Sequence, residues 1–126
     1  MIWGATLGGE FLYTGGEDQR LIKWTYKGSR KIVKSVKCPY RIRSLDMSQD
    51  NQMLAVGFIT GVVSIYNSDT LERNDKLTYS KIKNPDQEVL NIVRFHSKGK
   101  FLAVSYSCPK PKLIFFGLNS PMKILG

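Results

Sequence analysis

The sequence predicts an all-β protein built from repeated small antiparallel sheets, and three observations carry this prediction. Apolar and polar residues alternate along short segments bounded by turn residues, and no long stretch has the helical period of about 3.6 residues. Three similar segments, residues 11–15, 53–57 and 101–105, start 42 and 48 positions apart. Each is followed by a strand-like segment that ends in an aromatic residue: Trp24, Tyr66 or Phe116.

This repeat of short strands is typical of the blades of a β-propeller. Repeats of about 40–50 residues with four strands each indicate that architecture. A single blade carries apolar residues on both faces of its sheet and can bury them only against neighbouring blades. We therefore expect a partial β-propeller of about three four-stranded antiparallel blades.

The expected strands also divide the chain. With the strands of a blade named a to d from the centre outward, residues 1–26 supply strands b, c and d. Residues 27–68 and 69–119 each form a full blade, and residues 120–126 begin strand a of the next one. A ring needs about four to eight blades. We therefore expect the faces at the two ends to be covered by the rest of its own propeller, or by a second copy in a homodimer.

Composition narrows the class of function. The net charge of +9 favours an acidic partner, which could be nucleic acid, anionic lipid or an acidic protein surface. The longest apolar runs, such as residues 112–118, are too short to span a bilayer, and residues 1–10 do not resemble a secretory signal. Two cysteines 70 positions apart, Cys38 and Cys108, are expected to be reduced thiols of an intracellular protein.

No catalytic or metal-binding constellation is recognisable. His96 is the only histidine, and no cysteine pair has the close spacing of zinc ligands. Acid–base or triad chemistry needs a base with an orienting partner, and the sequence offers none. We therefore expect neither an enzyme nor a metal or cofactor site.

Residues 15–24, Gly-Gly-Glu-Asp-Gln-Arg-Leu-Ile-Lys-Trp, resemble the end of a WD repeat, with Asp18 as the turn aspartate and Trp24 as the terminal tryptophan. The chain is similar, among WD-repeat proteins, to the echinoderm microtubule-associated protein-like (EMAP-like) family. The segments that carry this likeness are Ile-Trp-Gly at 2–4, Leu-Ala-Val-Gly at 54–57, and residues 60–61, 66–72 and 95–104. The resemblance implies a WD-repeat propeller whose structural blade positions are Asp18, Trp24, Gly57, Gly61, Tyr66 and Phe116.

The densest charge feature is the stretch 27–43, which holds seven basic residues and no acidic one. We interpret it as the loop before an inner strand, that strand and the turn after it, so that its basic residues line one rim and part of the central channel. They are candidate contacts for an acidic partner, and the alternative is a solvated basic face: Lys27, Arg30, Lys31, Lys34, Lys37, Arg41 and Arg43. A second stretch without acidic residues, 89–126, is expected to carry its basic residues mostly in turns, where they serve ordinary solubility.

The partner most consistent with these features is a protein. Nucleic-acid binding is not favoured, because most aromatic residues fall at repeat-equivalent strand positions, where they build the core rather than stack on bases. The EMAP-like resemblance implies a non-catalytic module that binds tubulin or the microtubule lattice, located in the cytoplasm, cytoskeleton or cilium. The alternative is a generic WD-repeat scaffold in another intracellular complex, such as one for RNA processing or a ubiquitin ligase.

Overall fold

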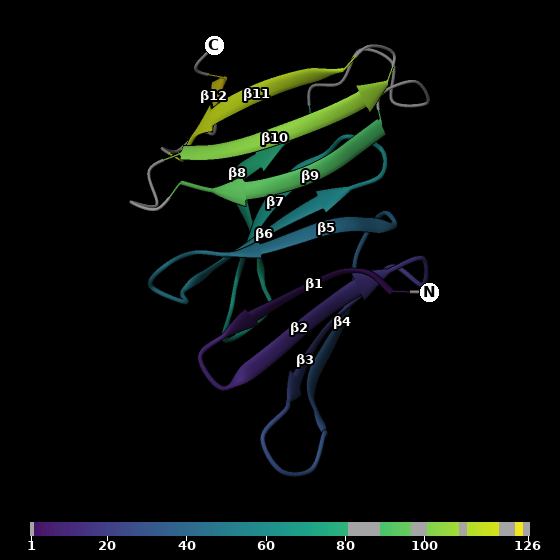
Figure 1. The fold of residues 1–126 in the computed structure, drawn as a ribbon, viewed down its shortest axis with the longest axis vertical. Helices are drawn as coiled ribbons and strands as arrows, with labels where there is room; N and C mark the ends of the chain where they lie inside the picture. The colour runs from purple at the N-terminus through teal and green to yellow at the C-terminus, as the bar shows by residue number, and fades with distance from the viewer. Residues whose placement is uncertain (1, 81–88, 97–100, 109–110, 119–122, 125–126) are drawn as a thin grey trace.

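A computed structural model describes residues 2–80, 89–96, 101–108, 111–118 and 123–124, and every helix or strand element in these ranges is a strand. The strands form three four-stranded antiparallel sheets, and each sheet takes its strands in sequence order. Figure 1 shows the three sheets stacked from the bottom of the view to the top. The prediction of an all-β chain with about three four-stranded sheets is confirmed.

The three sheets share one register. The first contains β1 (Ile2–Gly8), β2 (Phe11–Gly16), β3 (Arg20–Thr25) and β4 (Ile32–Lys37). The second contains β5 (Ile42–Met47), β6 (Met53–Phe58), β7 (Val63–Asn67) and β8 (Arg73–Tyr79). The third contains β9 (Val89–Phe95), β10 (Phe101–Cys108), β11 (Lys112–Gly117) and β12 (Lys123–Ile124). The repeated aromatic residue pairs with a leucine in each sheet: Leu12 with Trp24, Leu54 with Tyr66, and Leu102 with Phe116.

The grouping of strands differs from the prediction by one strand. The first strands of the sheets, β1, β5 and β9, lie side by side, so they are the inner strands, and β4, β8 and β12 lie at the outer edges. Strand β4, expected to open the blade of residues 27–68, instead pairs with β3 and completes the first sheet. In the same way β8 completes the second sheet, and β12 completes the third rather than starting a fourth.

A local contact explains this difference. The chain reverses after β3 through a short turn in which Thr25 N–H donates to the Lys31 carbonyl over 2.9 Å, so a hairpin forms at once. The sequence spacing of the strands is the same for either grouping, and it therefore could not separate an outer strand from the next inner one.

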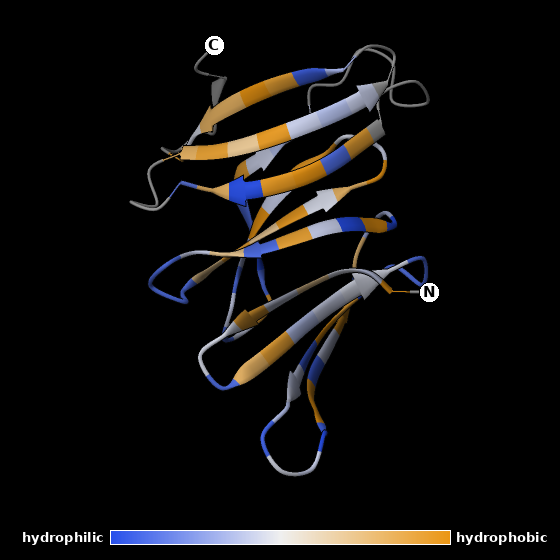
Figure 2. Ribbon diagram, in the orientation of Figure 1, coloured by the Kyte–Doolittle hydropathy of each residue, from blue (hydrophilic) through white to orange (hydrophobic). Residues whose placement is uncertain are grey.

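Two cores fill the spaces between the sheets. Figure 2 shows hydrophobic residues along the strands of all three sheets. The first interface, between the first and second sheets, buries Tyr13, Leu21, Cys38, Ile42, Leu45, Leu54, Val56, Phe58, Val62, Tyr66 and Leu71. The second interface, between the second and third sheets, buries Ala55, Val63, Ile65, Leu90, Val93, Leu102, Val104, Tyr106 and Phe116. The middle sheet is therefore apolar on both faces, as the propeller prediction requires.

Glycine lets the sheets approach closely at one repeated position. Gly15 and Gly57 occupy equivalent places on β2 and β6. A methyl group added to Gly15 would lie 2.6 Å from Ile42 Cγ2, and one added to Gly57 would lie 2.7 Å from Leu90 Cδ2. Side chains at these positions would force the sheets apart, which explains the glycine at 57 that the sequence marked as structural.

The outward faces of the first and third sheets keep apolar side chains exposed. We call the face of the third sheet that points away from the second sheet its open face. Its exposed apolar residues are Ile92, Phe101, Leu113 and Phe115. The first sheet likewise exposes Leu7, Ile32 and Val33. These faces are chemically similar to the ones that pack within the two interfaces.

Candidate functional site

The seven basic residues chosen from the sequence do not share one surface. The β3–β4 turn carries Lys27, Arg30 and Lys31, whereas Lys37 and Arg41 lie at the opposite end of β4. A six-residue strand is about 20 Å long, so the two groups are separated by most of the height of the sheet. The expectation that this stretch forms an inner strand along one rim and the channel is wrong for all but its last member. Arg43 alone lies on an inner strand, β5.

Four of these residues form a surface that we call the outer basic edge: Lys27, Arg30, Lys31 and Lys34. All four are exposed, and none has a carboxylate partner among the residues described. The turn that holds them is ordered, because Thr25 Oγ1 donates to the Ser29 carbonyl over 3.0 Å and accepts from Lys31 N–H over 3.1 Å. Gly28 supplies the left-handed conformation that the turn requires, with a φ of 78°. In Figure 1 this turn is at the bottom of the view.

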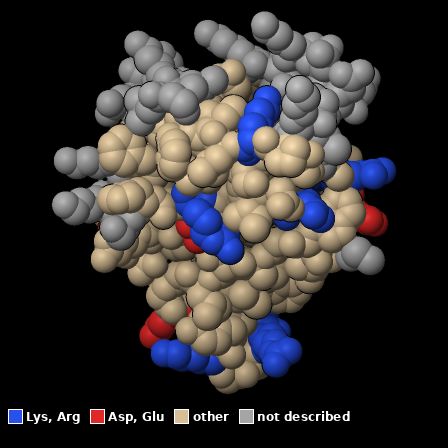
Figure 3. Space-filling model, turned by 45° about the horizontal axis from the view of Figure 1, so that its top comes forward, with Lys and Arg blue, Asp and Glu red and all other residues tan. Residues whose placement is uncertain are grey.

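The basic residues at the other end of β4 have different surroundings. Lys37 Nζ donates to the carbonyl of Asp18 over 2.9 Å and thereby ties β4 to the β2–β3 turn. The Asp18 carboxylate accepts from Arg20 N–H over 3.1 Å within that turn, so it is a turn-forming residue. Figure 3 shows another face of the molecule, on which blue basic side chains are scattered over a mostly uncharged surface. On this face the positive charge is thus spread out rather than gathered into one patch.

A second group of residues converges where the inner strands begin. The pairing of β1 with β2 shifts at Trp3, that of β5 with β6 shifts at Arg43, and that of β9 with β10 shifts at Asn91. Such β-bulges redirect the side chain of the extra residue. The Arg43 guanidinium lies over the Trp3 ring, 5.9 Å from its centroid, and Nη2 donates to Asn91 Oδ1 over 3.4 Å. We call these three residues the inner-strand cluster.

The cluster lines a hollow of about 290 Å³. Arg94 of β9 also lines it and donates from Nη1 to the carbonyl of Val93 over 3.1 Å. Of these residues, only Arg43 was a candidate site residue from the sequence. Trp3 and Asn91 were not, and Arg94 belongs to the stretch 89–126, whose basic residues were expected to serve loop solubility. The available signal was the matching position of all three cluster residues, eight to ten residues before a repeat segment that starts at Phe11, Met53 or Phe101.

The structural blade positions lie in strands and turns that build the sheets. Trp24, at the end of β3, donates from Nε1 to Thr14 Oγ1 on β2 over 2.9 Å. Gly61 turns the chain between β6 and β7 with a φ of 96°, and its carbonyl accepts from Tyr106 OH over 2.9 Å, which links the second and third sheets. Tyr66 and Phe116 are buried in the first and second interfaces. These residues hold the sheets together.

A buried thiol lies within the first interface. Cys38 follows β4, and Tyr66 OH donates to its Sγ over 3.4 Å. Burial raises the pKa of the Cys38 thiol and, still more, the pKa of the Tyr66 hydroxyl. Both groups are therefore neutral near pH 7, which does not suit Cys38 for nucleophilic chemistry.

The residues that the structure describes also bear on metal binding and membrane insertion. These residues contain no cluster of three or more His, Cys, Asp or Glu side chains placed to hold a metal ion. They also contain no helix long and apolar enough to cross a membrane. The side chain of Cys108 lies outside the part of the chain that the structure describes.

Comparison with solved structures identifies the fold. The chain superimposes on the β-propeller domain of Cps50 (Swd1) from Myceliophteria thermophila with a TM-score of 0.79 and 18% sequence identity, over 99% of this chain and 41% of that one. It is a β-propeller fold. A putative 6-phosphogluconolactonase from Bacteroides uniformis ATCC 8492 gives a TM-score of 0.81 at 14% identity, over 99% of this chain and 40% of that one. No known protein-family profile and no curated protein sequence matches the chain.

The comparisons fix the architecture and leave the subfamily open. This chain spans about two fifths of the length of both matched proteins, which fits a run of three blades from a larger ring. The partial propeller is therefore confirmed, whereas its WD-repeat type stays a prediction from the sequence. Neither match supports the EMAP-like family. Identities of 14% and 18% carry no information about substrate or partner.

Proposed function

We propose that this chain is part of a non-catalytic propeller scaffold that binds an acidic protein surface through the outer basic edge. The observation that carries the proposal is the composition of the β3–β4 turn and β4. Lys27, Arg30, Lys31 and Lys34 are exposed on an ordered hairpin, and no carboxylate among the described residues neutralises them. An ordered turn presents its charges with less loss of entropy on binding than a mobile loop would.

Charge of this kind acts collectively. A single exposed ion pair contributes roughly 0–1 kcal/mol, so one lysine would not hold a partner. Several like charges on one edge accelerate encounter with an acidic surface, and salt screens that attraction within about 10 Å at 0.1 M ionic strength. Beside these charges, Ile32 and Val33 are 56% and 50% exposed. They offer apolar contact area that would supplement the electrostatic attraction.

The specific partner is part of the proposal. The EMAP-like resemblance favours the acidic tails of tubulin on the microtubule lattice, and with them a location in the cytoskeleton or cilium. The broader alternative is a scaffold subunit of another intracellular complex, such as one for RNA processing or a ubiquitin ligase. Both versions use the same basic edge, so they differ only in which acidic protein it contacts.

Co-sedimentation with microtubules over a range of salt concentrations tests two parts of the proposal: that tubulin is the partner, and that the outer basic edge is the binding surface. Changing Arg30, Lys31 and Lys34 together to Glu should lower affinity at least about tenfold at low salt, because three attractive contacts become repulsive. A matched control changes three exposed basic residues elsewhere, Arg20, Arg41 and Lys76, to Glu.

The outcomes separate the alternatives. If the unaltered chain does not pellet even at low salt, the tubulin version is wrong, and the same pair of variants should then be tested for binding to acidic proteins in general. Equal losses in the two triple variants would show that net charge alone drives binding. The outer basic edge would then be an ordinary solvated surface.

A further inference from the structure

The inner-strand cluster has the chemistry of a small anion site, separate from the outer basic edge. We propose that it binds a single carboxylate group from an acidic side chain of a partner polypeptide, with Arg43 as the principal contact. Strands β1 and β4 are the two edges of a four-stranded sheet. Three strand spacings of about 4.8 Å place them about 14 Å apart. The proposal does not depend on the outer basic edge being a binding surface.

The Arg43 side chain is held in position before any ligand arrives. The Trp3 ring lies against its guanidinium at 5.9 Å, and Asn91 Oδ1 accepts one of its N–H groups at 3.4 Å. A guanidinium has five N–H donors in a planar fork that matches the two oxygens of a carboxylate. One donor is used by Asn91, and no carboxylate within the described ranges takes the others. A preorganised donor loses little entropy on binding.

The rest of the hollow also offers donors. Asn91 accepts from Arg43 through Oδ1, which leaves its amide N–H groups directed away from that bond. Arg94 donates from Nη1 to the Val93 carbonyl, and its other N–H groups have no partner within the part of the chain that the structure describes. Ser44, a hydroxyl side chain in the lining, accepts from Val93 N–H through Oγ over 3.1 Å and keeps its own O–H as a donor. None of the described residues that line the hollow is acidic. A hollow lined by donors and bearing positive charge selects an anion.

The size of the hollow indicates what kind of anion enters. Its volume of about 290 Å³ is at the lower end of small-molecule pockets, which run from about 300 to 1,000 Å³. It suits one side chain better than a nucleotide or a cofactor. The Trp3 ring supplies an apolar wall for the methylene groups that precede a carboxylate. A glutamate side chain meets both requirements.

The three bulges indicate that this convergence belongs to the fold. A bulge interrupts the ladder of backbone hydrogen bonds, and bulges are common where a side chain must be re-aimed beside a functional site. Here they recur at one position in all three inner strands, at Trp3, Arg43 and Asn91. The residues are chemically unlike, so packing alone does not account for their identities.

Nuclear magnetic resonance offers a direct test, because the chain has only two tryptophans, Trp3 and Trp24. The full ¹⁵N-labelled chain is titrated with an acetylated, amidated hexaglutamate peptide, and the two indole N–H signals are followed. The Trp3 signal should shift and saturate. The Trp24 indole, whose Nε1 donates to Thr14 Oγ1, reports on the outer basic edge instead, because Trp24 pairs with Ile32 beside that edge. A Trp24→Phe variant assigns the two signals.

Paired variants separate a defined site from general attraction. Arg43→Gln should weaken binding about tenfold or more, as expected for loss of a charged hydrogen-bond donor. Arg41→Gln removes the same charge two residues earlier and outside the hollow, and should change affinity less than about twofold. In each variant without peptide, an unmoved Trp24 signal verifies that the sheet is folded.

Three results would overturn the proposal. One is a Trp3 signal that does not respond to the peptide, and another is an equal loss of affinity in the Arg41 and Arg43 variants. The third is loss of the Trp3 response in the variant with Arg30, Lys31 and Lys34 changed to Glu, since the cluster would then have no binding of its own. Loss of microtubule binding in that same variant, with the Trp3 response preserved, would support two independent sites.

Discussion

The two interfaces between the sheets use the same register with different chemistry. One position on the third strand of each sheet recurs from sheet to sheet, and we call it the repeated slot. Lys23 occupies it in the first interface and Ile65 occupies it in the second, and each pairs with the equivalent residue of the preceding strand. Both side chains are buried, at 4% and 2% exposure. In the third sheet the same slot holds Phe115, which is 44% exposed on the open face.

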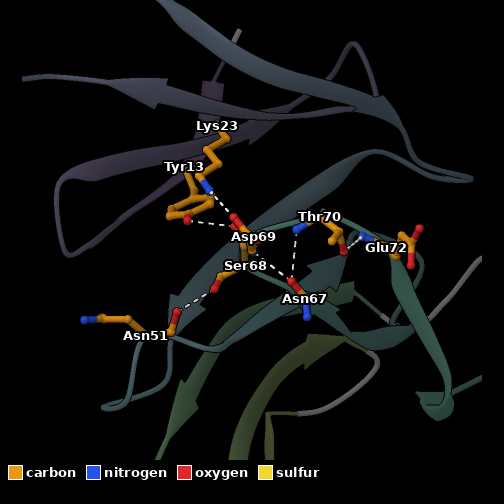
Figure 4. Close-up of polar contacts among 8 residues, drawn as sticks. All are labelled: Tyr13, Lys23, Asn51, Asn67, Ser68, Asp69, Thr70 and Glu72. Atoms are coloured by element: carbon orange, nitrogen blue, oxygen red, sulfur yellow. Dashed lines mark hydrogen bonds and ion pairs between the residues drawn. The ribbon is translucent and has the colours of Figure 1, made fainter.

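The charged residue in the first interface is accommodated by local partners. Figure 4 shows Lys23 and Tyr13 reaching the turn after β7, where Lys23 Nζ lies 3.4 Å from Asp69 Oδ1 and Tyr13 OH donates to the Ser68 carbonyl over 2.8 Å. The ammonium group also lies 4.1 Å from the centre of the Phe11 ring. The turn is itself fixed by Asn67 Oδ1, which accepts from Asp69 and Thr70 N–H groups at 2.8 and 2.9 Å.

The second interface bridges its inner strands with side chains instead. Ser44 Oγ accepts from Val93 N–H over 3.1 Å, and Asp46 Oδ2 accepts from Phe95 N–H over 2.7 Å. In the first interface, Gly4 occupies the place of Ser44, and a methyl group there would lie 3.1 Å from Leu45 N. Between the inner strands, the first interface therefore relies on close backbone approach and the second on polar bridges. Sheet stacking in this fold therefore fixes the shape of an interface and the register of its strands, whereas the side-chain chemistry at each equivalent position can differ.

The largest expected effect comes from shortening the apolar side chain at the repeated slot. Ile65→Ala should lower the free energy of unfolding by about 3 kcal/mol, because it removes buried methyl groups and leaves a cavity. Phe115→Ala, the matched change on the open face, should lower it by less than about 1.5 kcal/mol, because much of that ring is already in water. Urea denaturation followed by circular dichroism measures both values.

The Phe115 variant also reports on what covers the open face. A loss as large as that of Ile65→Ala would mean that another sheet packs on Phe115 in solution. If that loss disappears on dilution, the covering sheet belongs to a second copy of the chain, because dilution removes a partner copy and leaves intramolecular contacts unchanged.

A smaller effect is expected from the charged slot of the first interface. Lys23→Met keeps the length of the side chain and should change the free energy of unfolding by no more than about 1 kcal/mol, because replacing a buried charge by an apolar isostere is often neutral or stabilising. Asp69→Ala should destabilise by about 1 kcal/mol, because it leaves the buried ammonium without its carboxylate. In the double variant the Asp69 effect should vanish. A double-mutant cycle in urea tests this, and additive losses would show that the ion pair does not stabilise the interface.

The smallest effect is an alkaline loss of stability that belongs to the first interface. The folded-state pKa values of Cys38 and Tyr66 lie above their unfolded values because both groups are buried. The contribution of these two groups to stability is fully present below about pH 8.5, the ordinary pKa of an unfolded thiol. It is lost as pH rises through the folded-state pKa values of the two groups. The urea midpoint should therefore begin to fall above about pH 8.5. In Cys38→Ala the decline should begin only near pH 10, where unfolded tyrosines ionise. Identical profiles would contradict the role of Cys38.

Sequence reasoning succeeded where a signal repeats at short range. The three segments that begin at Phe11, Met53 and Phe101 became β2, β6 and β10, and the aromatic residues 11 to 13 positions after the centre of each segment fell in one register. The sequence-based assignment of β4 was wrong, because a strand that mixes lysines and valines has the same pattern whether it is the last strand of one sheet or the first strand of the next. The outer basic edge was found as charge but placed in the channel for this reason.

What the sequence by itself determined is the repeated strand unit, its apolar faces on both sides and the excess of positive charge, because alternation and composition are local properties of the chain. The tertiary structure alone decided which strand lies inside, which basic residues meet, and that Trp3, Arg43 and Asn91 converge. Those three residues are 40 and 48 positions apart, and only the parallel alignment of three inner strands, with a bulge at the same height in each, brings them together.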